Sequence, residues 1–260
     1  MKGIFAALLA LALPSASALA QAADKAEAHY YPRPTEAAGA AHPWLIMLPG
    51  GGGIDVFGDS HFYFDVAREW NKAGFDVLVI HYQAAAPLVK GAAQANPAAM
   101  EAAVVADAVA TAREKHWLDL QCPGMVMGYS LGGAGTLKLA AEPPKTLVGA
   151  IGFYPAVVGQ SEDYRAAIPV LALEGDLDQV APRARLDAFV AKSKDPAKFT
   201  VVHYPGAHHG FDIPSLAEPK TYQGGMFQYQ AEATKASDRE VAAFRRARLA
   251  AAHAPAECKI

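Results

Sequence analysis

The stretch Gly128-Tyr129-Ser130-Leu131-Gly132-Gly133 contains the pattern G-x-S-x-G between an apolar segment, residues 125–127, and a helix-compatible segment, residues 134–141. A strand, a sharp turn with a serine between two glycines, and a helix are the context of a nucleophile elbow. The strained turn leaves little room two residues before and after the serine, so glycine is expected at both places. The pattern therefore predicts an exposed Ser130 hydroxyl and a Leu131 amide directed at a developing oxyanion. A glycine-rich loop without chemistry is the alternative interpretation.

A carboxylate partner for such a serine follows a later apolar strand. A serine hydroxyl needs an adjacent base, and the base needs an orienting carboxylate; in hydrolases with this elbow the chain order is Ser, acid, His. The apolar run at 170–173 ends in Glu174-Gly175-Asp176-Leu177-Asp178-Gln179-Val180-Ala181-Pro182. Asp178 fits the spacing G-x-x-D-x-x-x-P, so we prefer it to Asp176 as the triad acid. A helix-capping role is the alternative for either residue.

The candidate base follows the last predicted strand, in the segment Tyr204-Pro205-Gly206-Ala207-His208-His209-Gly210-Phe211. Adjacent histidines suggest a metal site, but no HExxH or other ligand spacing accompanies them. A loop histidine after a strand end, in the expected chain order, is better interpreted as the general base. We favour His209 over His208 because it directly precedes Gly210-Phe211. No metal and no organic cofactor is expected.

A glycine run supplies candidates for the second oxyanion donor, besides the Leu131 amide. The segment Leu48-Pro49-Gly50-Gly51-Gly52-Gly53 follows a strand that should lie beside the elbow strand. Successive glycines let a backbone approach a substrate oxygen closely and turn its N–H groups inward. A phosphate-binding loop is disfavoured because no Gly-Lys-Ser/Thr follows. Gly51 and Gly52 are equally good candidates on sequence alone.

The first 20 residues have the features of a secretory signal peptide. Lys2 precedes an apolar run at 4–13, and small residues at 17–20 precede Gln21, which predicts cleavage after Ala20. The apolar run is too short for a stable membrane anchor. We therefore expect residues 21–260 to form a single domain in a periplasmic or secreted protein.

Composition narrows the choice of partners. The chain is 52% hydrophobic and 19% charged, which is typical of a globular enzyme. The formal net charge of −3 becomes −4 without Lys2, and no basic patch indicates nucleic acid. A small-molecule acyl substrate is the expected partner, and the oligomeric state is left open. Cys122 and Cys258 should both lie away from the active site, where a disulfide between them is geometrically feasible but not established by sequence.

Short apolar runs alternate with longer helical patterns. The predicted strands are residues 28–32, 44–48, 75–82, 125–129, 147–154, 168–173 and 199–204. The predicted helices are residues 60–72, 97–116, 131–141, 182–192 and 231–252. Within the last helix, Ser237 and Glu240 have the spacing of a capping box. Continuously apolar strands such as residues 77–80 indicate burial on both faces, which predicts the α/β class: a mostly parallel central sheet with helices on both faces.

Two connections are longer than packing requires, at residues 83–95 and 212–228. Both follow strand ends on the side expected for Ser130, so we expect them to form walls of a substrate pocket. Ordinary surface loops are the alternative. The connection at 155–167 is short and leaves no room for a large lid domain.

With these residues identified, the sequence resembles the α/β-hydrolase superfamily and, within it, the dienelactone hydrolase family. The resemblance covers most of residues 21–260, and its most specific parts are residues 128–133, 175–182 and 204–211. Residues 54–58 resemble the family's loop after the first core strand, where a Glu often stands in place of Asp55. The resemblance implies the α/β-hydrolase fold, with Ser130 as nucleophile, Asp178 as acid and His209 as base.

Two departures from the family pattern bear on the substrate. Family members proper usually carry Cys where this chain has Ser130, and the arginines with which they hold a substrate carboxylate have no evident match. We therefore do not expect dienelactone itself to be the substrate. The low charge of the two long connections favours a neutral or apolar acyl group.

The sequence thus predicts a serine hydrolase that cleaves a carboxylic ester, a lactone or a related acyl bond through an acyl-enzyme. A peptidase or an acyltransferase with the same triad is the main alternative, because the acyl-enzyme chemistry is shared. A non-catalytic binding protein that kept the fold is a third hypothesis, disfavoured by the presence of all three triad residues in the expected turns.

Overall fold

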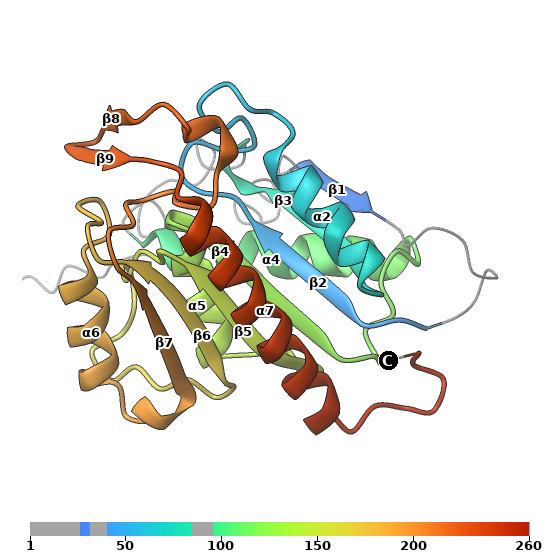
Figure 1. Cartoon of the computed structure of the whole chain (residues 1–260). Coiled ribbons are helices and arrows are strands. Elements are labelled where there is room, and N and C mark those ends of the chain that lie inside the picture. The colour runs from blue at the N-terminus through green and yellow to red at the C-terminus, as the bar shows by residue number, and fades with distance from the viewer. Residues whose placement is uncertain (1–26, 32–40, 85–95, 260) are drawn as a thin grey trace, which may run out of the picture.

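A central sheet of seven strands organises the computed structural model, which describes residues 27–31, 41–84 and 96–259 (Figure 1). In spatial order the strands are β1 (Glu27–Tyr31), β3 (Asp76–His81), β2 (Trp44–Leu48), β4 (Gly124–Tyr129), β5 (Leu147–Phe153), β6 (Val170–Gly175) and β7 (Phe199–Tyr204). All neighbours pair in parallel except β1, which runs antiparallel to β3 at one edge. The predicted signal peptide and residues 85–95 lie outside the described residues.

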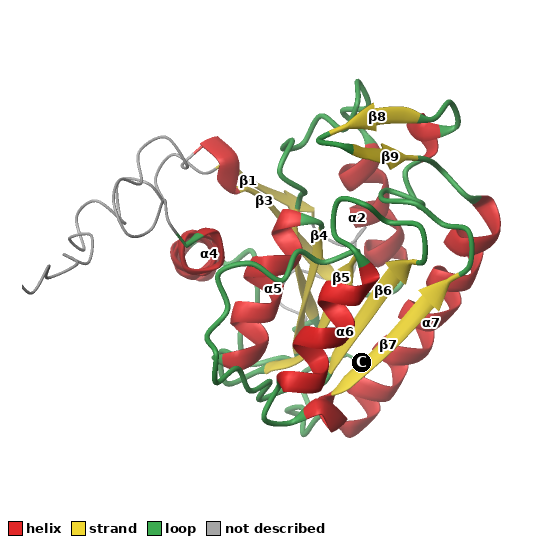
Figure 2. Ribbon diagram, turned by 90° about the vertical axis from the view of Figure 1, so that its left-hand side faces the viewer, coloured by secondary structure: helices red, strands yellow, loops and turns green. Residues whose placement is uncertain are grey.

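Helices cover both faces of this sheet (Figure 2). They are α2 (Phe62–Lys72), α4 (Pro97–Glu114), α5 (Leu131–Ala141), α6 (Arg183–Lys192) and α7 (Ala231–Ala251), with short 3₁₀ turns at Tyr82–Ala84, Pro196–Lys198 and Pro214–Leu216. Side chains from α4 and α5, with Phe189 of α6, pack on one face, and side chains from α2 and α7 pack on the other. The predicted fold class, a mostly parallel sheet with helices on both faces, is confirmed.

The strands form where the sequence predicts them because both of their faces are covered. Every residue of β2 and β4 is buried, which explains their continuous apolar character. All seven predicted strands and all five predicted helices are present, with ends that differ by no more than two residues. In the parallel register Gly128 of β4 lies beside Leu48 of β2 and Gly152 of β5. The elbow therefore lies next to the carboxyl end of β2, where the glycine run begins.

Two local features differ from the sequence predictions. The connection at 212–228 contains a small hairpin, β8 (Lys220–Tyr222) and β9 (Gly225–Phe227), whose two turn residues Gln223 and Gly224 both have positive φ. Strands of three residues are too short to show a recognisable alternation of apolar and polar residues in the sequence. The capping box is wrong: α7 begins at Ala231, and the Ser237 hydroxyl donates to the Thr234 carbonyl inside the helix.

A disulfide joins Cys122 to Cys258, with 5.6 Å between their Cα atoms and 136 residues between them in the chain. It ties the segment after α7 to the start of β4, at the end of the sheet opposite the elbow. A short parallel bridge between Ala41 and Cys258 lies beside it. Closing a loop of this length lowers the entropy of the unfolded chain by an amount worth about 5 kcal/mol in the chain-entropy treatment.

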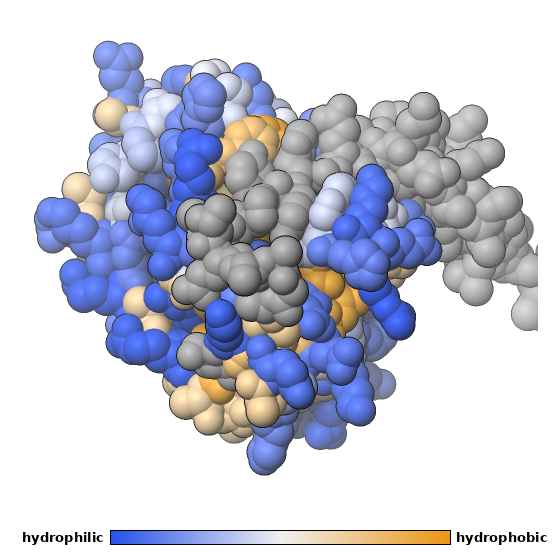
Figure 3. Space-filling view, turned by 90° about the vertical axis from the view of Figure 1, so that its right-hand side faces the viewer, coloured by the Kyte–Doolittle hydropathy of each residue, from blue (hydrophilic) through white to orange (hydrophobic). Residues whose placement is uncertain are grey.

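The surface on the β1 side of the molecule is mostly hydrophilic among its described residues, with small separate apolar areas (Figure 3). The large hydrophobic side chains that are exposed in the described residues lie elsewhere, at the carboxyl ends of the strands and in β8–β9: Val158, Leu177, Tyr222 and Met226. Scattered apolar residues are ordinary on a protein surface, but a cluster at one place marks a binding site.

Candidate active site

Ser130 occupies the sharp turn between β4 and α5. Its φ of +52° and ψ of −114° place it in a region that side chains rarely adopt. A Cβ on Gly128 would lie 2.2 Å from the Gly132 carbonyl oxygen, and one on Gly132 would lie 2.4 Å from the Pro49 carbonyl oxygen. The turn is held by the Ser130 amide, which donates to the Phe153 carbonyl at 2.9 Å. The glycines of the motif are therefore required by close backbone packing.

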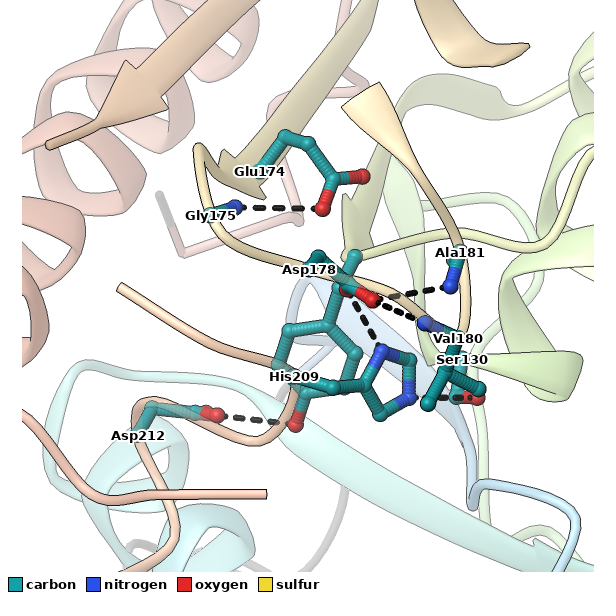
Figure 4. A network of polar contacts seen from close by, with 9 residues as sticks. Ser130, Glu174, Gly175, Asp178, Val180, Ala181, His209 and Asp212 are labelled. Atoms are coloured by element: carbon teal, nitrogen blue, oxygen red, sulfur yellow. Dashed lines mark hydrogen bonds and ion pairs between the residues drawn. The ribbon is translucent and has the colours of Figure 1, made fainter. Parts of the chain in front are cut away.

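A chain of hydrogen bonds connects Ser130, His209 and Asp178 (Figure 4). His209 Nε2 lies 2.9 Å from Ser130 Oγ, and His209 Nδ1 lies 2.6 Å from Asp178 Oδ2. The other carboxylate oxygen of Asp178 accepts the amides of Val180 and Ala181 at 2.7 and 2.8 Å. His209 is 2% exposed, so its ring is held in place by the residues packed around it. The three residues proposed from sequence thus meet in the geometry that nucleophilic catalysis needs.

The two competing sequence candidates lie outside this chain of hydrogen bonds. Asp176 is partly exposed and pairs with Arg183 at 2.7 Å. His208 precedes His209 but does not line the cavity that contains Ser130. Side chains of consecutive residues in this loop point in different directions, and that is what separates His209 from His208.

The glycine run beside the elbow has only some of its amides engaged. The Gly50 amide donates to the Tyr63 hydroxyl at 2.8 Å, and the Gly53 amide donates to the Gly50 carbonyl at 3.0 Å. A Cβ on Gly51 would lie 3.4 Å from Leu131 Cδ2, whereas the nearest atom to one on Gly52 is the Asp55 carbonyl oxygen at 3.9 Å. Of the two candidates left open by sequence, Gly51 is therefore the one beside Leu131.

Three polar side chains that sequence reasoning did not identify fix this glycine run. Besides Tyr63, the Tyr82 hydroxyl donates to the Pro49 carbonyl at 3.2 Å, and Gln83 Nε2 donates to the Gly50 carbonyl at 2.5 Å. A run of four glycines has high conformational entropy when free. These bonds hold its amides in place before a substrate arrives. No local signal in the sequence links these three residues to the loop.

A second buried carboxylate lies behind the base. The Tyr154 hydroxyl donates to Asp212 Oδ1 at 2.8 Å, and the Tyr154 ring centroid lies 4.4 Å from that of His209. Burial raises the pKa of Asp212 to about 7, although the hydrogen bond from Tyr154 acts in the opposite direction. The nearby charge of Asp238 raises this pKa further. Asp212 thus titrates near neutral pH without touching the triad directly.

Glu174 is a third acid near the triad, and it is fully buried. Burial, and then the negative charge of Asp178, raise its pKa to about 10, while the bond from the Gly175 amide acts in the opposite direction. Glu174 is therefore uncharged at neutral pH, and Asp178 is the acid of this turn that bonds His209.

We expect Asp212→Asn to stabilise the fold at pH 8 by a few kcal/mol and to change it little near pH 4. The pKa of Asp212 is near 7 in the folded chain and near 3.8 in the unfolded chain. Between these values only the unfolded chain loses the proton, so the stability of the wild-type protein falls as pH rises. Since one pKa unit corresponds to about 1.4 kcal/mol, the full effect is on the order of 4 kcal/mol.

Urea unfolding of the wild-type protein and of Asp212→Asn at several pH values measures this effect. Asparagine keeps an acceptor for the Tyr154 hydroxyl but carries no charge. The difference in unfolding free energy should grow from about pH 4 to pH 7 and then level off. A difference that is independent of pH would mean that Asp212 does not carry a raised pKa.

A cavity of about 500 Å³ opens above Ser130. Its walls come from the glycine run, the following residues 55–57, the ends of β5 and β6, and the connection after His209. Ile213, Tyr222, Gln223 and Phe227 of the predicted wall at 212–228 line it, which confirms that prediction. Most of the other predicted wall, residues 85–95, lies outside the described residues.

In residues 27–31, 41–84 and 96–259, no helix combines the length and apolar content needed to cross a membrane. No group of three or more His, Cys, Asp or Glu side chains there is arranged so that it could hold a metal ion.

Solved structures of hydrolases share this architecture. A dienelactone hydrolase-like promiscuous phosphotriesterase from metagenomic libraries aligns over 86% of this chain and 99% of its own, with a TM-score of 0.67 and 16% identity. Esterase 2 of Thermogutta terrifontis, solved phosphorylated by paraoxon, aligns over 84% of this chain and 86% of its own (TM-score 0.58, 17% identity). Est1E of Butyrivibrio proteoclasticus, solved with ferulic acid, aligns over 86% and 96% (TM-score 0.57, 15% identity). At these identities the likeness establishes the α/β-hydrolase fold.

Sequence comparison gives the family. A search of curated proteins finds no match. The model of the dienelactone hydrolase family, in contrast, matches residues 29–248, which include the elbow, the acid-bearing turn and the histidine loop. With the fold and this match together, the chain belongs to the dienelactone hydrolase family of hydrolases.

Proposed function

We propose that the protein is a serine hydrolase that cleaves a carboxylic ester, a lactone or a related acyl bond through an acyl-enzyme. The observation that carries this proposal is the hydrogen-bonded chain from Ser130 Oγ through His209 to Asp178, with bonds of 2.9 and 2.6 Å, at the base of a cavity. Membership of a family of hydrolases supports it.

In the first half-reaction Ser130 Oγ attacks the acyl carbonyl carbon while His209 Nε2 takes the hydroxyl proton. Asp178 stabilises the imidazolium and fixes its orientation through Nδ1. The amides of Leu131 and Gly51 donate to the oxyanion of the tetrahedral intermediate. When the carbon–oxygen bond to the leaving alcohol breaks, His209 returns the proton to the alcohol oxygen.

In the second half-reaction water replaces the alcohol. His209 removes a proton from the water, whose oxygen attacks the acyl-enzyme carbonyl. Collapse of the second tetrahedral intermediate releases the carboxylic acid and returns the proton to Ser130 Oγ. The balance of the cycle is one ester and one water consumed for one alcohol and one acid released, without a cofactor.

The proposal is tested by labelling the full chain with a fluorophosphonate and locating the adduct by peptide mass spectrometry. We expect one adduct, on Ser130, and parallel loss of 4-nitrophenyl acetate hydrolysis as labelling proceeds. The phosphorylated state of the Thermogutta terrifontis esterase supports the choice of an organophosphorus probe. Absence of both labelling and turnover would favour a non-catalytic binding protein on this fold.

Two further assays separate the hydrolase from its closest alternatives. A peptidase should also cleave the 4-nitroanilide that corresponds to an accepted ester, and an acyltransferase should transfer the acyl group to an added alcohol in preference to water.

We also place the protein outside the cytoplasm. The signal-peptide pattern at residues 1–20 supports this, as does the Cys122–Cys258 disulfide, since disulfides persist mainly in oxidising compartments. A small-molecule acyl substrate remains the proposed partner.

A further inference from the structure

We propose that the substrate is an uncharged ester whose alcohol part is apolar and of aromatic size. This proposal rests on the proposed function and adds the substrate class. It depends on three properties of the cavity: an aromatic corner beside the base, an apolar mouth, and a negative charge from Asp55.

The aromatic corner consists of Phe57, Tyr222 and Phe227. The ring centroids lie 5.9 Å apart for Phe57 and Tyr222, 5.0 Å for Phe57 and Phe227, and 6.0 Å for Tyr222 and Phe227, all in edge-to-face arrangements. All three residues line the cavity. Such a corner accepts another aromatic ring through the same edge-to-face contacts.

The position of the base assigns this corner to the alcohol part. His209 Nε2 must give its proton to the leaving oxygen, so the alcohol group has to lie on the imidazole side of the scissile carbonyl. Phe227 is the side chain of the corner that touches the base, with 4.8 Å between the Phe227 and His209 ring centroids. An alcohol group that receives the proton therefore extends toward Phe227 and its two aromatic neighbours.

The mouth of the cavity is also apolar. Of the large hydrophobic side chains exposed in the described residues, Val158 and Tyr222 line the cavity, and Met226 and Leu177 lie in the neighbouring β9 and acid-bearing turn. Tyr222 is 51% exposed and Val158 40%. Leaving such groups in water is unfavourable, and an apolar substrate would cover them.

Charge is distributed unevenly around the cavity. Among its described lining residues, Asp55 is the one acidic side chain, and there is no Lys or Arg. Its Oδ1 accepts the Gly58 amide at 2.7 Å, which holds it on the same loop as Phe57. Lys220 is the basic group beside the corner: its ammonium donates to the Phe57 carbonyl at 3.0 Å and lies 5.4 Å from the centroid of the Phe57 ring, but the residue is not part of the cavity lining. Inside the cavity, an anionic alcohol part would therefore meet the like charge of Asp55.

Size sets an upper limit on the substrate. Cavities that bind small molecules have volumes of roughly 300–1,000 Å³, and this one lies in the lower half of that range. An aryl ester with a short acyl chain fits into this volume. A polymer is too large to be enclosed in it on all sides.

The test compares two esters that differ in charge and match in size, 3-carbamoylphenyl acetate and 3-carboxyphenyl acetate. Each kcat/KM is divided by the rate of hydroxide hydrolysis of the same ester, which removes the difference in leaving-group reactivity. We expect the wild-type protein to prefer the neutral ester by at least about tenfold, because the carboxylate of the anionic ester is repelled by Asp55, the one acidic side chain of the cavity lining.

Asp55→Asn should reduce this preference to about threefold or less by accelerating hydrolysis of the anionic ester. The matched control is Glu232→Gln, which makes the same change in net charge on an exposed part of α7 and should leave the preference unchanged. Equal rates for the two esters in the wild-type protein would overturn the proposal. A preference that Asp55→Asn does not reduce would overturn the assignment of charge selection to Asp55.

A second variant tests the aromatic corner. Tyr222→Ala should lower kcat/KM for phenyl acetate about three- to tenfold and change that for ethyl acetate less than twofold, because only the aryl alcohol reaches the corner. An equal loss with both esters would overturn the placement of the alcohol part. Turnover of 4-nitrophenyl acetate and fluorophosphonate labelling are measured in the same preparations, so a failure of ester selectivity is distinguishable from absence of hydrolase activity.

Discussion

Ser130→Ala is expected to lower kcat for 4-nitrophenyl acetate by at least ~10³-fold while leaving the fold intact. In the proposed mechanism the substitution removes the nucleophile, Ser130 Oγ, which lies 2.9 Å from His209 Nε2. His209, Asp178 and the oxyanion amides stay in place, so a residual rate above that of water should remain. KM should change little because the other residues that line the cavity stay in place.

The measurement needs a control for the general effect of losing a serine hydroxyl. Ser237→Ala provides it, since Ser237 is buried in α7 and its hydroxyl bonds only within the helix. Alanine is a strong helix former, and this control should retain full activity. Circular dichroism and thermal unfolding should show both variants folded. Wild-type turnover by Ser130→Ala would remove Ser130 from the mechanism.

The elbow could be predicted from sequence because its requirements are local. A Cβ on Gly128 would meet the Gly132 carbonyl of the same strand–turn–helix, and one on Gly132 would meet the carbonyls of Leu48 and Pro49 at the end of the adjacent strand β2, so this close approach recurs wherever the elbow lies beside its neighbouring strand. The strands could also be predicted from local sequence. Because both faces of the sheet are buried, every residue of the central strands β2 and β4 is apolar or small. Asp178 could be preferred over Asp176 because the turn that follows β6 constrains the spacing of Gly, Asp and Pro.

Other parts of the site depend on contacts between segments that are distant in sequence. No pattern in the sequence indicates these contacts. Tyr154 and Asp212 are 58 residues apart, and their bond arises only once β5 and the loop after β7 lie side by side. The same holds for Tyr82, which reaches the glycine run from 33 residues away. The choice between Gly51 and Gly52 also required the structure. Successive glycines are equivalent in sequence, and only the conformation of the loop shows which one lies beside Leu131.

Asp178→Asn is expected to lower kcat by about 10⁴-fold, because it stabilises the wrong tautomer of His209. In the wild-type protein Asp178 Oδ1 accepts the amides of Val180 and Ala181, and Oδ2 accepts Nδ1–H of His209. Asparagine has one carbonyl oxygen and one NH₂ group. If its oxygen keeps the two backbone amides, its NH₂ group faces Nδ1.

That arrangement forces Nδ1 to act as an acceptor and leaves the proton on Nε2, which can then no longer take the proton of Ser130. The opposite orientation of the amide would present NH₂ to two N–H donors and leave the two partly buried amides of Val180 and Ala181 without their acceptor, which is unfavourable. The matched control is Asp176→Asn, two residues earlier in the same turn, where the carboxylate pairs with Arg183 at the surface. Its kcat should stay within about twofold, since exposed pairs contribute little. If both variants lost activity equally, the turn itself would be responsible; if Asp176→Asn alone lost it, the acid would have been assigned to the wrong carboxylate.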